Sequence, residues 1–293
     1  MFTVEPRKDA LETLELRDTE SNALLVLAPA RGGMATRLAL AGKHVFFLDE
    51  ATLRDPSKNV RGGNPVLFPS PGKLESDRWK HGELKQHGFA RNVAWEVAST
   101  DTKTAASATL RLASSDATRG TYPWDFVTEY TYALAGASLR IEMRFSNRST
   151  DPMPFGAGFH PYFHVKSSDK ARARVVTKAT RAFDNVRKET VTLAGDSRGA
   201  SIDLTQKEVD LHLLDHGAAP CVLDLGAERP RRIVLAGSPE FTHWVVWTLE
   251  NKDFVCVEPW TCPGNALNTG DRIITLAGGA ERTLWVEYTV EGG

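Results

Sequence analysis

Two side chains that can carry a proton each stand directly before a proline in this sequence. Glu258 ends the apolar run FVCVE within Asp253–Gly270, and His160 lies in FHPYFHV within Phe155–Val165. Proline has no backbone donor and biases the preceding residue toward an extended conformation, so we expect Glu258 to be held stiffly at a strand end. A carboxylate and an imidazole can together perform general acid–base catalysis. The competing interpretation of Glu258 is a surface residue beside an ordinary turn.

Turn-forming segments contribute further candidate site residues. Arg61 precedes a glycine pair in NVRGGNPVLFP, where the backbone can approach a ligand closely, and its guanidinium can clamp a polar ligand. The spacing there fits neither a P-loop nor a dinucleotide-binding fingerprint, which argues against nucleotide chemistry. His87 stands on a glycine loop in QHGFARN, with Arg91 four residues later. In EVDLHLLDHG, Asp210 or Asp215 can accept hydrogen bonds from a hydroxylated ligand, although capping and turn formation are commoner uses.

Metal and disulfide chemistry find little support in the residue pattern. His160 and His164 share the i,i+4 spacing of some metal ligands, but Pro161 disfavours a helix there and no HExxH glutamate is present. The three cysteines have no CxxC spacing, which argues against a disulfide framework or a zinc site. Cys256 alternates with valines in a presumed strand, and we interpret it as a packed small hydrophobe. We therefore expect neither a metal site nor a disulfide framework.

The elements that must position these residues are β-strands. Short segments with period-two alternation, rich in β-branched and aromatic residues, are separated by Gly, Asn, Asp or Pro, which is typical of an all-β chain. Helical periodicity is scarce, and only Leu204–Leu214 is predicted to form a turn or two of helix. A large antiparallel β-sandwich is the predicted fold. The clearest strand segments are Phe126–Leu134, Leu139–Asn147, His243–Leu249 and Thr283–Val290.

Size and charge narrow the classes of function. All-β sandwiches often reach about 250 residues as one domain, so we predict a single domain over residues 1–293. The 36 Lys and Arg residues nearly balance 37 Asp and Glu residues, so no net field attracts nucleic acid or an anionic membrane. The N-terminus lacks a signal-peptide pattern, and no apolar run approaches the ~20 residues of a spanning helix. We expect a cytoplasmic protein.

Five segments, taken in order, resemble the aldose 1-epimerase (mutarotase) family of the galactose mutarotase-like superfamily. They are RGGNPVLFP, HGFARN, YPWDF, FHPYFHV and VEPWTCPGNALNTG, and together they span most of the chain. The resemblance implies an extended antiparallel β-sandwich and a sugar substrate, without a cofactor, in a monomer or weak homodimer. It further implies that Glu258 is the general base, His160 the general acid, His87 a contact to the sugar ring oxygen, Arg61 a substrate-binding arginine and Asp210 a ligand of sugar hydroxyls.

The implied reaction interconverts the α and β anomers of a hexose by opening and closing the ring. A carboxylate beside His160 is expected to favour the imidazolium that such a general acid needs. A related branch acts on hexose 6-phosphates and shares the RGG and HGFAR segments, so Arg61 and Arg91 are candidates for a phosphate site. The WTCPGNALNTG tail is closer to enzymes of free aldoses, which favours glucose or galactose. A non-catalytic carbohydrate-binding protein is the alternative of another class, and Trp260, Phe163 or Trp124 can stack on a sugar or belong to the core.

Overall fold

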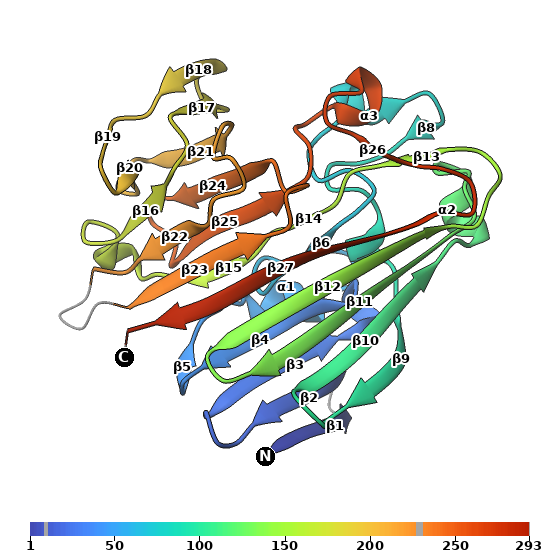
Figure 1. Cartoon of the computed structure of the whole chain (residues 1–293), viewed down its shortest axis with the longest axis horizontal. Helices are drawn as coiled ribbons and strands as arrows, with labels where there is room; N and C mark the ends of the chain where they lie inside the picture. The colour runs from blue at the N-terminus through green and yellow to red at the C-terminus, as the bar shows by residue number, and fades with distance from the viewer. Residues whose placement is uncertain (9–10, 227–230, 293) are drawn as a thin grey trace.

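Antiparallel β-strands make up most of the regular structure in the computed structural model, which describes residues 1–8, 11–226 and 231–292 (Figure 1). The largest sheet has ten strands, and its longest members form a continuous antiparallel ladder. In spatial order the strands are β19 (Gly195–Asp196), β20 (Gly199–Asp203), β16 (Arg174–Thr177), β22 (Cys221–Asp224), β23 (Arg232–Gly237), β27 (Glu281–Glu291), β12 (Ser138–Asn147), β11 (Phe126–Ala135), β10 (Ala106–Ala113) and β9 (Glu96–Asp101).

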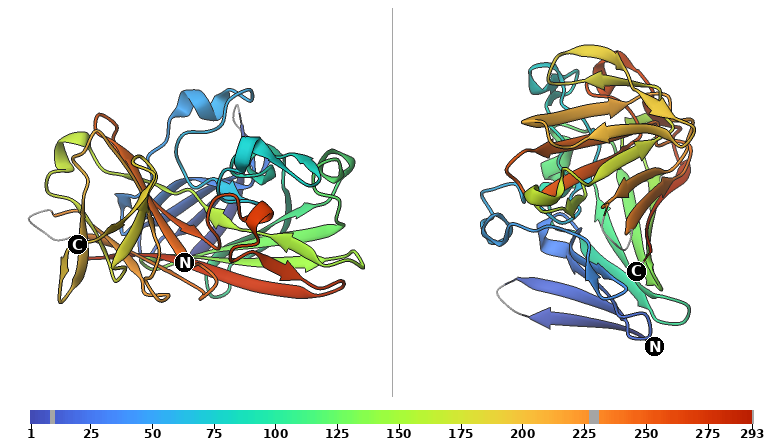
Figure 2. Two further views of the ribbon diagram at one scale, coloured as in Figure 1. Left: turned by 90° about the horizontal axis from the view of Figure 1, so that it is seen from above. Right: turned by 90° about the vertical axis from the view of Figure 1, so that its left-hand side faces the viewer.

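Two further sheets lie against this ten-stranded sheet. An N-terminal sheet contains β1 (Phe2–Lys8), β2 (Glu12–Asp18), β3 (Ala23–Ala28), β4 (Met34–Leu40) and β5 (Lys43–His44). An eight-stranded sheet contains β18 (Glu189–Thr192), β17 (Arg181–Asp184), β21 (Glu208–Leu213), β24 (His243–Leu249), β25 (Phe254–Trp260), β14 (Gly158–Phe159) and β6 (Val66–Leu67), with β15 (Tyr162–His164) also paired to β25. Figures 1 and 2 show the blue N-terminal strands and the yellow and orange strands at opposite ends, joined by the long green strands and red β27.

Short elements fill the connections between the sheets. Two ribbons pair β7 (Arg78–Trp79) with β8 (Gly82–Glu83) and β13 (Met153–Phe155) with β26 (Ile274–Leu276). The α-helices are single turns, namely α1 (Glu50–Arg54), α2 (Asp116–Arg119) and α3 (Ala266–Thr269), and 3₁₀ turns cover Pro29–Arg31, Glu75–Asp77, Ala90–Asn92 and Ser167–Asp169. Across the described residues, no helix has the length and apolar character required to cross a membrane.

A shared hydrophobic core joins the three sheets, and aromatic side chains make several of its contacts. Tyr288 of β27 meets Phe163 of β15 edge to face, with ring centroids 5.8 Å apart. Tyr130 of β11 meets Phe159 of β14 at 5.6 Å. Each such buried ring removes a large apolar area from water. Because Phe159 and Phe163 flank His160 in sequence, the core holds the backbone on both sides of that histidine.

The all-β prediction is confirmed, and the four predicted strand segments correspond to β11, β12, β24 and β27. The helical prediction for Leu204–Leu214 is wrong, because this segment contributes β21, which pairs with β24 on one side and β17 on the other. Val209 and Leu213 of β21 are buried, so their packing in the sheet outweighs a weak helical pattern. That residues 1–293 form a single domain stays a prediction.

Candidate active site

The candidate site lies at a gap in the eight-stranded sheet. β15 pairs with β25 from Phe254 to Cys256, and β14 pairs with it again only at Trp260. Pro161 and Pro259, which have no N–H to donate, both lie in the unpaired interval. β25 nevertheless continues through Glu258 to Trp260, so the predicted strand end at Glu258 is wrong. The prolines instead mark where two strands separate, which leaves space for side chains between them.

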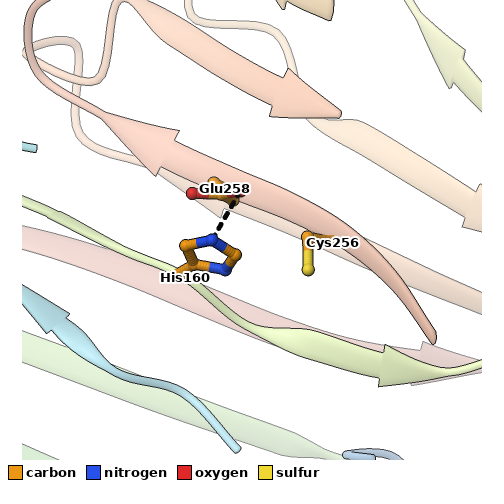
Figure 3. A group of neighbouring side chains, drawn as sticks. All are labelled: His160, Cys256 and Glu258. Atoms are coloured by element: carbon orange, nitrogen blue, oxygen red, sulfur yellow. Dashed lines mark ion pairs between the residues drawn. The ribbon is translucent and has the colours of Figure 1, made fainter. Parts of the chain in front are cut away.

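Glu258 and His160 meet across this gap (Figure 3). The Nε2 atom of His160 lies 3.3 Å from Oε1 of Glu258. His160 is only 8% exposed and Glu258 only 1%, and both line a cavity of about 440 Å³. A cavity of this size falls in the range typical of small-molecule sites. Two proton carriers in contact at the wall of such a cavity are arranged for acid–base chemistry on a small ligand.

Trp260 holds the other oxygen of the Glu258 carboxylate. Its indole Nε1–H donates a buried hydrogen bond of 3.0 Å to Oε2. Glycines make room for the indole: a Cβ on Gly72 or Gly158 would stand 3.1 or 3.0 Å from ring atoms of Trp260. Alternation along β25 places Glu258 and Trp260 on the same face, which explains why residues two apart can bond in this way. The carboxylate is thus fixed by one neighbour on each oxygen.

Burial favours the neutral forms of both proton carriers. It raises the pKa of Glu258 well above its usual value, and the charge of Asp210 acts in the same direction. It lowers the pKa of His160, and the charges of His87 and Arg91 add to this effect. Desolvation therefore outweighs the neighbouring carboxylate, which the sequence predicted would favour the imidazolium. The neutral pair and the carboxylate–imidazolium pair contain the same protons and differ only in where one of them lies.

His87 lies beside His160, with ring centroids 5.4 Å apart. It lies on a loop, as the sequence predicts, and its side chain is buried there, with the backbone in the left-handed region at a φ of 72°. Non-glycine residues in this region are strained and are frequent at functional sites. Its Nδ1–H donates to the carbonyl of Pro71. Burial lowers the pKa of His87 to about 3, with Arg91 contributing, so at neutral pH its Nε2 carries a lone pair.

Basic side chains line another part of the cavity wall. Arg61 and Lys73 are exposed, and neither side chain forms an ion pair or hydrogen bond with another described residue. Arg91 is half-buried; its Nη2 donates to the carbonyl of Gln86, 3.0 Å away, and its Nε has no partner among the described residues. Burial lowers the pKa of Arg91, but arginine stays protonated at neutral pH. Three cationic side chains therefore line the cavity, and each has N–H groups that no described residue accepts.

Asp210 faces the same cavity, whereas its rival Asp215 does not. Asn185 Nδ2 donates to Asp210 Oδ2 at 2.7 Å, and His212 Nε2 lies 3.3 Å from Asp210 Oδ1. Burial acts to raise the pKa of Asp210, but these two partners outweigh it, and the pKa is lowered. Asp215 instead accepts hydrogen bonds from the backbone of Thr180 and the next residue, outside the cavity. The positions of the two side chains therefore identify Asp210, and not Asp215, as the aspartate that can contact a ligand in the cavity.

All of the residues predicted from sequence line one cavity: Arg61, His87, Arg91, His160, Asp210 and Glu258. Among the aromatic candidates, Trp260 lines it too, while Phe163 and Trp124 belong to the core. Sequence reasoning missed other lining residues. His212 lies two positions after Asp210 and shares its strand face, a relation that the helical prediction for this segment hid. Tyr162 lies two positions after His160 and stacks on its ring, with centroids 4.7 Å apart. Other missed lining residues, which had no clear signal, include Lys73, Asn185 and Trp247.

Comparisons with known proteins place this chain in a family. The sequence model of aldose 1-epimerase matches residues 51–289. The "Putative glucose-6-phosphate 1-epimerase" of Cenchrus ciliaris is 28% identical over 241 residues, covering 74% of this chain and 69% of that protein. The crystal structure of the Slr1438 protein from Synechocystis sp. PCC 6803 is 34% identical over the whole of both chains, with a TM-score of 0.91. Galactose 1-epimerase from Lactobacillus acidophilus NCFM shares the fold at 17% identity, with a TM-score of 0.75 over 100% of this chain and 98% of that one. The chain belongs to the aldose 1-epimerase family of isomerases.

Proposed function

We propose that this isomerase interconverts the α and β anomers of a hexose, with Glu258 as general base and His160 as general acid. The observation that carries the proposal is the contact between these two groups at the cavity wall, 3.3 Å apart. Anomer interconversion takes a proton from the C1 hydroxyl and gives one to the ring oxygen. Both oxygens are bonded to C1, so the base and the acid must be close neighbours to serve them together.

The reaction starts from the carboxylate–imidazolium form of the pair, reached when the shared proton moves from Glu258 to His160. Glu258 removes the proton of the C1 hydroxyl while His160 protonates the ring oxygen, so the bond between C1 and the ring oxygen breaks and a free aldehyde forms. After rotation about the C1–C2 bond, His160 takes its proton back from the attacking hydroxyl and Glu258 returns its proton to the carbonyl oxygen. The enzyme is regenerated without a co-reactant.

The remaining polar groups are proposed to hold the sugar hydroxyls. His87 differs here from the role implied by family resemblance, because its Nδ1–H is committed to Pro71 and its neutral Nε2 is an acceptor. An acceptor cannot donate to the ring oxygen, so we assign it to a hydroxyl of the sugar. Asp210 has both carboxylate oxygens in contact with Asn185 or His212, and remaining lone pairs can accept a further hydroxyl.

We assign the substrate to the hexose 6-phosphates rather than to the free hexoses favoured by the sequence. Arg61, Lys73 and Arg91 supply more positive charge than a neutral sugar can use, and a phosphate carries about −1.5 to −2 charges that such donors match. The name of the Cenchrus ciliaris relative agrees with this assignment.

The structural role of the C-terminal tail weakens the argument for a free sugar. Asn265 accepts from the backbone of Glu75 and donates its own N–H to the carbonyl of Lys73, and Asn268 donates to the carbonyl of Arg78. In the described structure neither asparagine lines the cavity. These two asparagines support the loop that carries Lys73, whereas Trp260 and Gly264 of the same tail line the cavity. A free hexose stays the second candidate on the tail sequence alone.

Anomer kinetics on three sugars decide between these possibilities. Polarimetry would follow freshly dissolved α-D-glucose and α-D-galactose, and a coupled assay would follow glucose 6-phosphate. We expect kcat/KM to be highest for the phosphate, and Arg61→Ala to lower it by about tenfold while leaving glucose unaffected. Arg54→Ala, an exposed arginine on α1 outside the cavity, is the matched control. Equal loss on both sugars would reject the phosphate assignment. Sugar binding by calorimetry without acceleration of any anomer would instead indicate a binding protein.

A further inference from the structure

Cys256 lies beside the proposed acid–base pair without taking part in it. It precedes Glu258 by two residues on β25, so both side chains project from the same strand face. Ligand atoms of His160, Cys256 and Glu258 all lie within 4.8 Å of one another, and all three residues are buried. Figure 3 shows the imidazole with one nitrogen toward Glu258 and the other on the side of Cys256. The three side chains surround one small volume at the cavity wall.

The thiol of Cys256 and the second ring nitrogen of His160 have no hydrogen-bond partner in the described structure. Nδ1 of His160 is buried and forms no hydrogen bond within the described structure. The thiol of Cys256 is fully buried, and it too forms no hydrogen bond with a described residue. Because Nδ1 has no hydrogen-bond partner, it can hold the imidazole proton, and Nε2 is then free to present its lone pair to a ligand shared with the thiol. Proton transfer by Glu258 and His160 gives no reason for a sulfur atom here.

The donor set selects the class of ligand. Sulfur, imidazole nitrogen and carboxylate oxygen together are the ligands of Zn²⁺ and similar borderline cations, whereas Mg²⁺ and Ca²⁺ take oxygen. With metal–ligand distances of about 2.0–2.3 Å, neighbouring ligands of a tetrahedral site lie roughly 3.3–3.6 Å apart. The 3.3 Å between Nε2 of His160 and Oε1 of Glu258 already meets this requirement, and the thiol, within 4.8 Å of both ligand atoms, would have to close by up to roughly 1–1.5 Å to reach the same spacing. The cavity, which both residues line, supplies an entry path and an open fourth position.

We propose that Cys256, His160 and Glu258 form a binding site for a Zn²⁺-type cation, and that the cation inhibits the enzyme by occupying its acid and base. On binding, the thiol releases its proton to solvent and the thiolate becomes a ligand. The inhibitory part rests on the proposed function, because it assigns the two shared ligands to catalysis. The binding part does not, and it can be measured in the absence of any substrate.

Direct titration of the full chain tests the site. After treatment with EDTA and its removal, ZnCl₂ is titrated by calorimetry, and CoCl₂ is followed by absorption, since thiolate-to-cobalt charge transfer reports a bound sulfur. We expect one cation per chain and a charge-transfer band. Cys256→Ser should abolish the band and weaken Zn²⁺ binding more than tenfold. Cys262→Ser, a buried cysteine further along the same tail, is the matched control and should change neither. Absence of binding, or a band that survives Cys256→Ser, would overturn the proposal.

Two further measurements keep the outcomes distinct. If Cys256→Ser does not fold, a cobalt band that survives both Cys221→Ser and Cys262→Ser identifies Cys256 by elimination, and loss of the band in either variant refutes the site. Zn²⁺ should also slow anomer interconversion of the wild type, with relief in folded Cys256→Ser. Binding without inhibition would refute the inhibitory role and keep the cation site. A protein that accelerates no anomer would refute the proposed function, while the titrations still decide whether the site exists.

Discussion

Removing one N–H from Trp260 should impair catalysis far more than it impairs folding. Trp260→Phe keeps an aromatic ring between the glycines but deletes the 3.0 Å hydrogen bond to Oε2 of Glu258. A buried hydrogen bond to a charged group contributes about 1.5–3 kcal/mol, which corresponds to roughly a 10- to 150-fold change in rate if it is lost from the catalytic carboxylate. We expect kcat to fall by a factor within this range. KM should change less, because the indole N–H donates to Glu258 and not to the substrate.

The pH profile gives the same variant a second, independent readout. The Trp260 hydrogen bond lowers the pKa of Glu258, so its loss must raise that pKa further. Because the resting pair is neutral, with its proton on Glu258, the alkaline limb of the pH profile reports the loss of that proton, and this limb should lie at a higher pH in Trp260→Phe than in the wild type. Trp244→Phe removes a part-buried indole hydrogen bond, to the carbonyl of Ala219, and should leave the profile unmoved. A Trp260→Phe enzyme with wild-type kcat and an unshifted profile would refute the reasoning.

Other perturbations test the site and its cost to stability. Glu258→Gln should lower kcat by about 10²–10⁴-fold in a folded protein, and near-full activity would remove Glu258 from the base role. Because its pKa is raised on folding, the carboxyl opposes stability as pH rises above its unfolded value, so Glu258→Gln should be more stable than wild type at pH 8 by about 1–4 kcal/mol, with a smaller gain at pH 4 in denaturant unfolding. Burial lowers the pKa of His87 and of His243 to about 3. The free energy of unfolding should therefore decrease as pH falls below about 6.5, by up to ~1.4 kcal/mol per pH unit for each histidine. A free energy of unfolding that stays constant from about pH 6.5 to 4 would contradict this. Asp210→Ala should raise KM at least tenfold and Asp215→Ala should not, which steady-state kinetics would reveal.

Much of the fold could be predicted from sequence because strand formation is local. The alternation of β11, β12, β24 and β27 is visible within each segment, since successive side chains point to opposite faces. The segment that forms β21 was misread, because its pairing partners, not its own pattern, make it a strand. Which strands become neighbours depends on contacts between distant residues, such as Tyr130 with Phe159, that no local pattern encodes.

The same distinction between local patterns and contacts of distant segments applies to the candidate site residues. Glu258 and His160 were detectable as proton carriers before prolines, and Arg61, His87 and Arg91 through glycine loops and family resemblance. Lys73 and Asn185 carried no comparable signal, because each lies in an ordinary-looking turn and reaches the cavity only through the packing of other segments. The part played by Trp260 was hidden as well: a stacking surface was foreseeable, but a hydrogen bond to the carboxylate two residues earlier required coordinates.

By itself the sequence determined the residue types, the most regular strands and the family, since these depend on local patterns and on motifs in a given order. Only the tertiary structure decided that Glu258 and His160 meet across a gap in a sheet, that Asp210 and not Asp215 faces the cavity, and that burial drives both proton carriers toward their neutral forms. The physical reason is that desolvation and proximity depend on the surroundings of a side chain, and segments far apart in the chain supply those surroundings.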